Sequence, residues 1–256
     1  MDISNRLAAL VVATTLLFTA CTKEDSSTSS SVSQTITNQA TLPDLNKCKI
    51  RRIYQNFYKR ETAVFTYNKV GNPFTVIYSN GGTGEHDHYF FYDSRNRLIK
   101  YQLLWGQQYV DEEHIYKYND KDQIVTDSFK RSDGEGAYPY QTVSTIEYDS
   151  FGRVVKETIE NTKNWDLPLE KVRRPTYTYD IRGNLAVAGW KSSSYDNKIN
   201  PLRQNAVFQF VHRNYSMNNA APQARYNSLG LPLSMKPTND AFFNAFVTEL
   251  VVYDCL

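Results

Sequence analysis

A short pattern that recurs through the middle of the chain constrains its fold more than any other feature. In six segments a tyrosine is followed by Asn or Asp, then by two variable residues, and then by Gly, Asn or Asp. The residues that open the pattern are Tyr67-Asn68, Tyr92-Asp93, Tyr118-Asn119, Tyr148-Asp149, Tyr179-Asp180 and Tyr226-Asn227. The residues that close it are Gly71, Asn96, Asp122, Gly152, Gly183 and Gly230. Repetition of this kind indicates one supersecondary unit used several times.

Each copy has the chemistry of a tight reversal between two strands. The Asn or Asp side chain can accept hydrogen bonds from nearby backbone and so open a turn. Gly, Asn and Asp best tolerate the positive φ that a tight turn needs. The residue two positions before each tyrosine is apolar, and the segments that follow the turns, such as 97–101 and 153–159, alternate as strands do. We therefore expect one strand–turn–strand hairpin per repeat.

These hairpins predict an all-β domain built as one antiparallel meander. Because exposed strand edges promote aggregation, we expect the sheet to curve, and a curved sheet and an open barrel or shell both satisfy the pattern. The interval between tyrosines lengthens to 47 residues between Tyr179 and Tyr226, which predicts an insertion near 191–222 that plugs one side. Within it, apolar spacing over 204–215 favours a short helix, and 246–253 is expected to be the closing strand.

The repeats resemble the YD repeats of the Rhs-like family. The segments that carry the resemblance best are Tyr-Asp-Ser-Phe-Gly-Arg-Val and Tyr-Asp-Ile-Arg-Gly-Asn-Leu, which begin at Tyr148 and Tyr179. The resemblance covers roughly residues 60–235 and implies a sheet of hairpins. In that family the repeats build a large β-shell around a toxin. This chain has few repeats and is more similar to small YD-repeat lipoproteins, a type with no established function.

The first 21 residues resemble a bacterial lipoprotein signal peptide. Arg6 precedes an apolar run over 7–18, which has the length of a signal-peptide core and is too short to span a bilayer. Leu17-Phe18-Thr19-Ala20-Cys21 then resembles a lipobox, which implies cleavage before Cys21 and acylation of its thiol. We therefore expect a signal peptide over 1–20 and a membrane partner reached through lipid on Cys21.

The segment after the predicted lipid site indicates a tether. Residues 21–46 are rich in Ser and Thr and poor in large apolar residues, so they cannot bury enough surface to form a core. Lys23-Glu24-Asp25 resembles the export signal of lipoproteins that reach the outer face of the outer membrane. The expected organisation is thus a tether over 21–46, a β domain over 47–256, and attachment to the outer membrane with the domain facing the cell exterior.

Two further cysteines flank the predicted domain. Cys48 and Cys255 stand near its ends, and an exported protein folds where disulfides can form. A bridge between them would require the first and last strands to be neighbours. The alternative is two thiols buried as small apolar groups.

Few residues carry recognisable chemistry. His86 and His88 would point to one side of a strand, as two metal ligands could, but no further ligand is evident, so they are weak candidates and we expect no metal or other cofactor. The segment 111–114, Asp-Glu-Glu-His, is expected to form a polar hairpin tip. With 29 basic and 27 acidic residues and no basic stripe, a nucleic-acid partner is not expected.

Aromatic side chains remain as a source of binding. Trp105, Trp165, Trp190 and many of the 19 tyrosines could stack on sugar rings if they gathered on one exposed face, or they could form cross-strand pairs within the sheet. The sequence therefore favours a non-enzymatic, lipid-anchored envelope protein that binds an unidentified ligand, such as a glycan or an envelope protein, and a dedicated glycan-binding lipoprotein is the first alternative. A metal-dependent hydrolase is the less favoured alternative.

Overall fold

A computed structural model describes most of the predicted β domain. The described residues are 48–56, 60–80, 84–135, 137–164, 173–186, 195–220, 225–235 and 247–255. They all belong to one unit of the chain, Pro43–Leu256. The predicted signal peptide, the tether and Cys21 lie outside the described residues, as do Trp165, Trp190 and Ala224.

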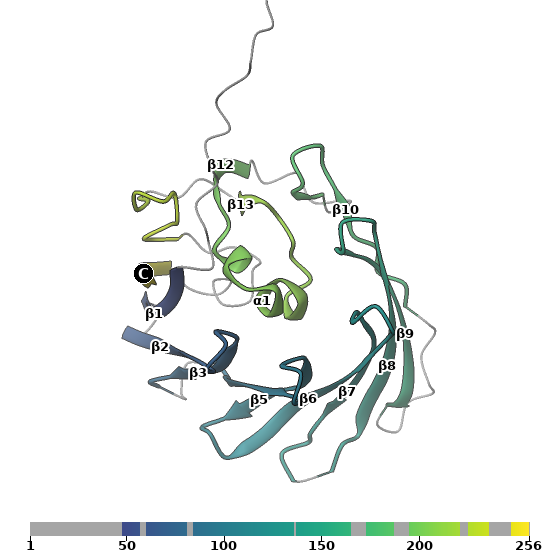
Figure 1. The fold of residues 1–256 in the computed structure, drawn as a ribbon. Coiled ribbons are helices and arrows are strands. Elements are labelled where there is room, and N and C mark those ends of the chain that lie inside the picture. Colours follow the sequence, from purple (N-terminus) through teal and green to yellow (C-terminus); the bar gives the residue numbers. More distant parts are fainter. Residues whose placement is uncertain are drawn as a thin grey trace, which may run out of the picture. The chain divides into compact units, whose positions relative to one another are not determined.

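Ten strands form a single antiparallel sheet in which neighbours in space are neighbours in sequence, apart from the last strand, which pairs with the first (Figure 1). In spatial order they are β14 (Val247–Cys255), β1 (Cys48–Asn56), β2 (Arg60–Tyr67), β3 (Pro73–Tyr78), β4 (Asp87–Tyr92), β5 (Leu98–Trp105), β6 (Tyr109–Tyr118), β7 (Ile124–Arg131), β8 (Tyr140–Tyr148) and β9 (Val154–Asn164). The all-β class and the antiparallel meander predicted from the repeats are confirmed. The sequence allowed a curved sheet or an open barrel or shell, and the structure has a curved sheet that does not close into a barrel.

Both outer strands of this sheet are paired with short segments. The carbonyl of Leu233 accepts a hydrogen bond from Val251 in β14 at 2.8 Å. On the other side, Ile159 in β9 and Arg173 exchange backbone hydrogen bonds of 2.8 and 3.0 Å. Unpaired edge strands attract further strands from other molecules. These segments therefore solve, without closure of the sheet, the problem that led us to expect curvature.

The repeats form the turns that their sequences predict. In the fourth repeat, the Asp149 carboxylate accepts hydrogen bonds from the backbone of Phe151 and Arg153, both at 2.9 Å. Gly152 closes the turn with φ of 75°. The equivalent closing residues also have positive φ: Gly71, Asn96, Asp122, Gly183 and Gly230. The first four turns join β2–β3, β4–β5, β6–β7 and β8–β9, and the fifth joins the short strands β10 (Thr178–Tyr179) and β11 (Leu185–Ala186).

The repeat tyrosines connect one hairpin to the next. In four of the six repeats, the tyrosine hydroxyl donates to the carbonyl of the residue that begins the strand after the previous turn, whereas Tyr67 donates to the Ile50 carbonyl in β1 and Tyr226 to the Asp196 carboxylate. The bonds are Tyr92 to Pro73 (2.7 Å), Tyr118 to Leu98 (2.8 Å), Tyr148 to Ile124 (2.7 Å) and Tyr179 to Val154 (3.2 Å). These tyrosines therefore do not only end a strand. Their hydroxyls also fix the spacing between successive hairpins.

The same bond identifies two tyrosines that the sequence pattern left out. Tyr195 donates to the carbonyl of Leu185 and Tyr253 to that of Pro232, both at 2.8 Å. Tyr195 lies within the predicted insertion near 191–222 and continues the tyrosine series there. Both residues are followed by Asp, and that dipeptide was the available signal. They were missed because Ile199 stands where a turn-closing Gly was sought, and because few residues follow Tyr253.

The rest of the insertion covers part of the concave face. It contains β12 (Tyr195–Ile199), the 3-10 turn η2 (Pro201–Gln204), α1 (Ala206–Val211) and β13 (Asn218–Ala220), and Figure 1 shows α1 inside the curve of the sheet. Phe208 packs edge-on against Phe65 and Phe90, at ring distances of 6.0 and 6.3 Å. These contacts belong to the main hydrophobic core. The predicted helix exists, although it is shorter than 204–215.

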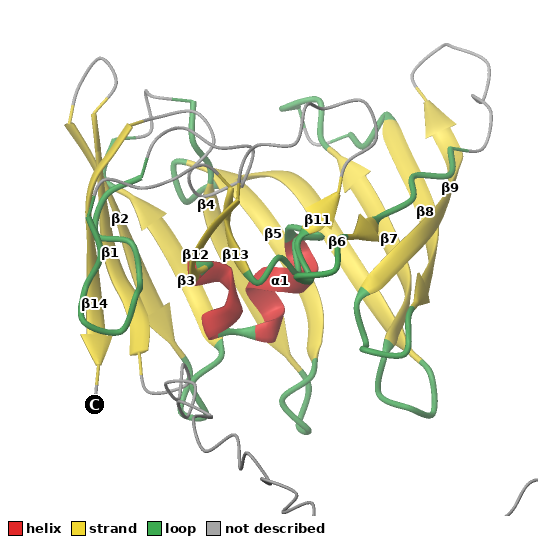
Figure 2. Ribbon diagram, turned by 90° about the horizontal axis from the view of Figure 1, so that it is seen from above, coloured by secondary structure: helices red, strands yellow, loops and turns green. Residues whose placement is uncertain are grey.

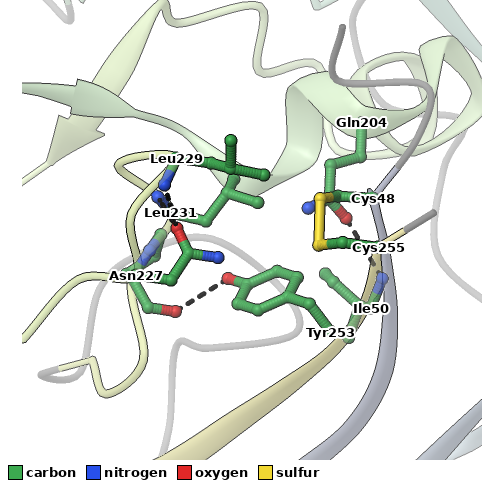
Figure 3. Close-up of a disulfide and its surroundings, with 9 residues drawn as sticks. Cys48, Ile50, Gln204, Asn227, Leu229, Leu231, Tyr253 and Cys255 are labelled. Atoms are coloured by element: carbon green, nitrogen blue, oxygen red, sulfur yellow. Dashed lines mark hydrogen bonds between the residues drawn. A yellow bond between two sulfur atoms is a disulfide. The ribbon is translucent and has the colours of Figure 1, made fainter. Parts of the chain in front are cut away.

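A disulfide joins the outermost pair of strands at the start of the domain. Cys48 in β1 and Cys255 in β14 are directly opposed and bonded, as Figure 3 shows. Beside them, Gln204 of η2 accepts a hydrogen bond from the backbone of Ile50 at 3.1 Å. The first and last strands are thus neighbours, which was the condition for this pairing. Among the described helices, none is long and apolar enough to cross a membrane.

Candidate functional site: a groove on the concave face

A groove of about 370 Å³ lies on the concave face beside the end of α1. Strands β5 to β9 form its floor, and Val211 and Arg213 bound it on the side of the helix. It is larger than a packing defect and falls in the size range of small-molecule sites. Its position follows from the length of α1, because the helix covers only part of the concave face.

A row of aromatic rings crosses six consecutive strands on this face. The successive ring distances are 6.0 Å from Tyr78 to His88, 5.8 Å to Tyr101, 5.7 Å to His114, 4.8 Å to Phe129 and 5.9 Å to Tyr140. The first three rings are buried, whereas the last three are half-buried and line the groove. Aromatic contacts of this kind stabilise a sheet. In the groove they also present apolar surface to a ligand.

Arg213 organises the charges at the inner end of the groove. Its guanidinium contacts Asp127 at 3.1 Å and Glu157 at 3.0 Å. The Asp127 carboxylate also lies 2.9 Å from His114 Nδ1, and Tyr177 donates its hydroxyl hydrogen to Glu157 at 2.6 Å. Burial alone would lower the pKa of Arg213, but the Glu157 and Asp127 carboxylates raise that pKa above its ordinary value. The cation is therefore kept charged inside the domain.

The backbone at Arg213 shows that this network is built into the fold. Arg213 follows α1 with φ of 50°, a position that usually takes glycine. The amide of Asn214 bonds back to the carbonyl of Gln209 at 3.0 Å, which closes the helix end. A left-handed backbone costs a residue with a side chain about 1–2 kcal/mol. The two ion pairs and the bond to the Phe210 carbonyl offset that cost.

The outer end of the groove is more exposed. Arg131 of β7 pairs with Glu112 of β6. Arg173 donates to the Tyr140 hydroxyl at 2.9 Å, and among the described residues no acidic side chain pairs with it. Thr142 lines the floor between the two ends. The groove therefore offers a guanidinium and hydroxyl groups beside half-buried rings.

The structure separates the two histidines considered as metal ligands. His86 Nε2 lies 2.9 Å from the Asp111 carboxylate, and its ring packs on Trp105 at 3.9 Å. His88 is buried and shares a hydrogen bond of 2.5 Å with the Tyr101 hydroxyl. Burial, followed by the charges of His212 and His86, holds the pKa of His88 well below its usual range. In the described part of the chain, no three His, Cys, Asp or Glu side chains are grouped to hold a metal ion.

Two interpretations of polar segments were wrong. The expectation that 111–114 forms a hairpin tip fails, because these residues lie within β6 and the tip is at residues 106–108. His114 faces the groove, whereas Glu113 faces the opposite side and pairs with Lys130 at 2.8 Å. The position of 85–88 directly after the Gly-rich segment 80–84 also predicts a solvated strand start, and this is wrong for His88, which is buried.

Most of the groove could not be identified from the sequence. Trp105, the one tryptophan among the described residues, lies at the end of β5 and packs against the His86 ring, outside the groove. The rings that line the groove are those of tyrosine, histidine and phenylalanine. Alternating residues in β6 to β8 were a usable signal, but their alignment depends on strand register. Arg213 gave no signal, because its partners lie 86 and 56 residues away. No protein-family model matches the chain, and no curated protein matches it.

Proposed function

We propose that this chain is a lipid-anchored protein of the outer membrane, facing the cell exterior, and that its β domain binds a saccharide in the concave groove. The anchor is the lipid expected on Cys21. The domain works by binding and not by catalysis. The observation that carries the proposal is the groove, in which half-buried rings stand beside hydroxyl groups and a guanidinium.

The chemistry of the groove suits a saccharide. Sugar rings have an apolar face, which can stack on Phe129 and Tyr140, and polar edges, which can bond to Thr142 and Arg173. The carboxylates of the groove are already paired with arginine or histidine. A paired carboxylate is a poor general base, so the arrangement favours recognition. An envelope protein that presents an aromatic or acidic side chain is the second class of ligand.

An array of bacterial and host glycans, probed with the full-length protein in mild detergent, tests the proposal. Phe129→Ala should weaken binding at least about tenfold, because removing a ring from a binding contact costs about 1.5–3 kcal/mol. Ile115→Ala is the matched control, because Ile115 is an exposed apolar residue on the opposite face of the same sheet. Absence of binding to every glycan, or equal losses in the two variants, would refute the saccharide proposal.

A further inference from the structure

We infer that the edge of the sheet that carries the repeat turns, called here the turn edge, docks on an anionic lipid surface and holds the groove away from the membrane. The turn edge consists of the turns at 68–72, 93–97, 119–123, 149–153 and 180–184. The inference rests on the proposed lipid anchor but not on the proposed saccharide ligand. Figure 2 shows the turns of the ten-stranded sheet along one side of it, with the C-terminal end on the same side, and the fifth turn belongs to the separate sheet of β10 and β11.

The direction of the strands brings the anchored end of the chain to the turn edge. Strand β2 runs toward the first turn, and β1 is antiparallel to it, so β1 begins at that edge. Lys49, the second residue of β1, lies over the Tyr67 ring at 5.3 Å, beside the first turn. The segment that leads back to Cys21 therefore enters the domain at Cys48 on this edge. A lipid on that segment keeps the turn edge at high effective concentration next to the bilayer.

The turn edge also exposes apolar side chains where a bilayer would meet them. Phe151, in the fourth turn, is 81% exposed, and Ile181, in the fifth, is fully exposed. The two turns are neighbours, because Arg153 lies over the rings of both Phe151 (5.0 Å) and Tyr179 (4.0 Å). Among the described large apolar residues these two are the most exposed. Adjacent apolar tips of this kind can enter the headgroup region of a membrane.

Charge at the tips favours anionic lipid. Of the exposed charged side chains in the five turns, four are basic (Lys69, Arg95, Lys121 and Arg182) and two are acidic (Asp120 and Asp122). The half-exposed acids Asp93 and Asp149 are paired with Arg97 and Arg153, and Asp180 lies 3.8 Å from Arg182, so the turns carry a small positive charge. Asp122 is already paired with Arg95 at 2.6 Å and with Arg97 at 2.8 Å. Basic residues near an anionic surface add to apolar insertion.

The opposite edge holds the groove. There, the connection between β7 and β8 exposes Asp133 and Glu135. Arg131 and Tyr140, which line the outer end of the groove, are paired across β7 and β8 next to that connection. Docking by the turn edge would therefore leave the groove open to the exterior.

Depth measurement in vesicles tests the inference on the full chain. The lipidated protein is reconstituted into equal parts phosphatidylethanolamine and phosphatidylglycerol, with a nitrobenzoxadiazole label on Ile181→Cys or, as the matched control, on Tyr109→Cys. Tyr109 is 65% exposed and lies beside the β5–β6 tip on the opposite edge. We expect spin-labelled lipid to quench the label at 181 several-fold more than the label at 109. Phe151→Ser, or replacement of phosphatidylglycerol by phosphatidylcholine, should reduce that quenching.

The failures of the anchor and of the docking are distinguishable. If the protein does not float with the vesicles, the lipid anchor is refuted and this inference falls with it. If the protein floats but the two labels are quenched equally, or the label at 109 more strongly, the anchor stands and the docking of the turn edge is refuted. Glycan binding by Phe129→Ala is a separate measurement and does not enter this result.

Discussion

Removing the disulfide between Cys48 and Cys255 should cost this domain much of its stability. The two cysteines are separated by 207 positions, so the bond closes almost the whole described domain into one loop. The loop-closure relation for a loop of this size gives about 5 kcal/mol from restriction of the unfolded chain. Domains of this kind are typically stable by about 5–15 kcal/mol, so the loss is a large fraction.

The double variant Cys48→Ala/Cys255→Ala isolates this contribution. Alanine is preferred to serine because Cys48 is only 1% exposed, and a buried hydroxyl without a partner would add a cost of its own. Strands β1 and β14 remain hydrogen-bonded along their length, so the native fold is expected to persist. The change therefore acts mainly on the unfolded state.

Urea unfolding of the full-length protein in mild detergent, followed by intrinsic fluorescence, measures the effect. With a slope of about 2–3 kcal/mol per molar urea, the midpoint should fall by about 2 M. Reductant should lower the midpoint of the natural sequence by a similar amount and leave the double variant unchanged. A decrease below about 0.5 M would refute the reasoning, because at the same slope it corresponds to little more than about 1 kcal/mol.

Three further predictions concern two repeat residues and Glu85, which lies just before β4. Each is measured by urea unfolding. Tyr148→Phe should destabilise the domain by about 1 kcal/mol, since it removes the 2.7 Å bond to the Ile124 carbonyl, whereas Tyr109→Phe at an exposed site should have no effect. Gly152→Ala should lower the free energy of unfolding by about 1–2 kcal/mol through the φ of 75° alone, because nothing lies within 4 Å of an added Cβ. Gly152→Asn should lower it less, and equal losses in the two variants would contradict this account. Burial and, second, the charge of Glu61 raise the pKa of Glu85 from 4.5 to about 7. Between these pH values the folded state holds a proton that the unfolded state has lost. The free energy of unfolding should therefore fall as pH rises from about 4.5 to 7. Glu85→Gln should therefore stabilise the protein more at pH 8 than at pH 5, a difference of opposite sign being the contrary result.

The turns could be predicted from the sequence because their interactions are local. In the turn at 149–153, the Asp149 carboxylate bonds to amides two and four residues away, and Gly152 meets a backbone requirement of its own. Six repetitions of this arrangement then imply hairpins, and hairpins joined in order imply an antiparallel meander. The helix in the insertion was predicted for the same reason, since its apolar spacing is a property of one short segment.

Other features depend on residues that only the folded chain brings together. Tyr195 donates to the Leu185 carbonyl although the turn sequence of the repeat is absent after it, so the tyrosine contact does not depend on that sequence. The aromatic row requires the registers of six strands to be known at once, and a slip of one residue would turn each ring to the other face.

The sequence by itself thus determined the local reversals and the all-β antiparallel class, because a few adjacent residues supply each of those interactions. The tertiary structure alone decided the pairing of β14 with β1, the contact of Arg213 with Asp127 and Glu157, and the groove beside α1. The physical reason is that these features arise from packing between segments tens of residues apart, and their register and depth are set only when the strands and the helix bury their apolar faces together.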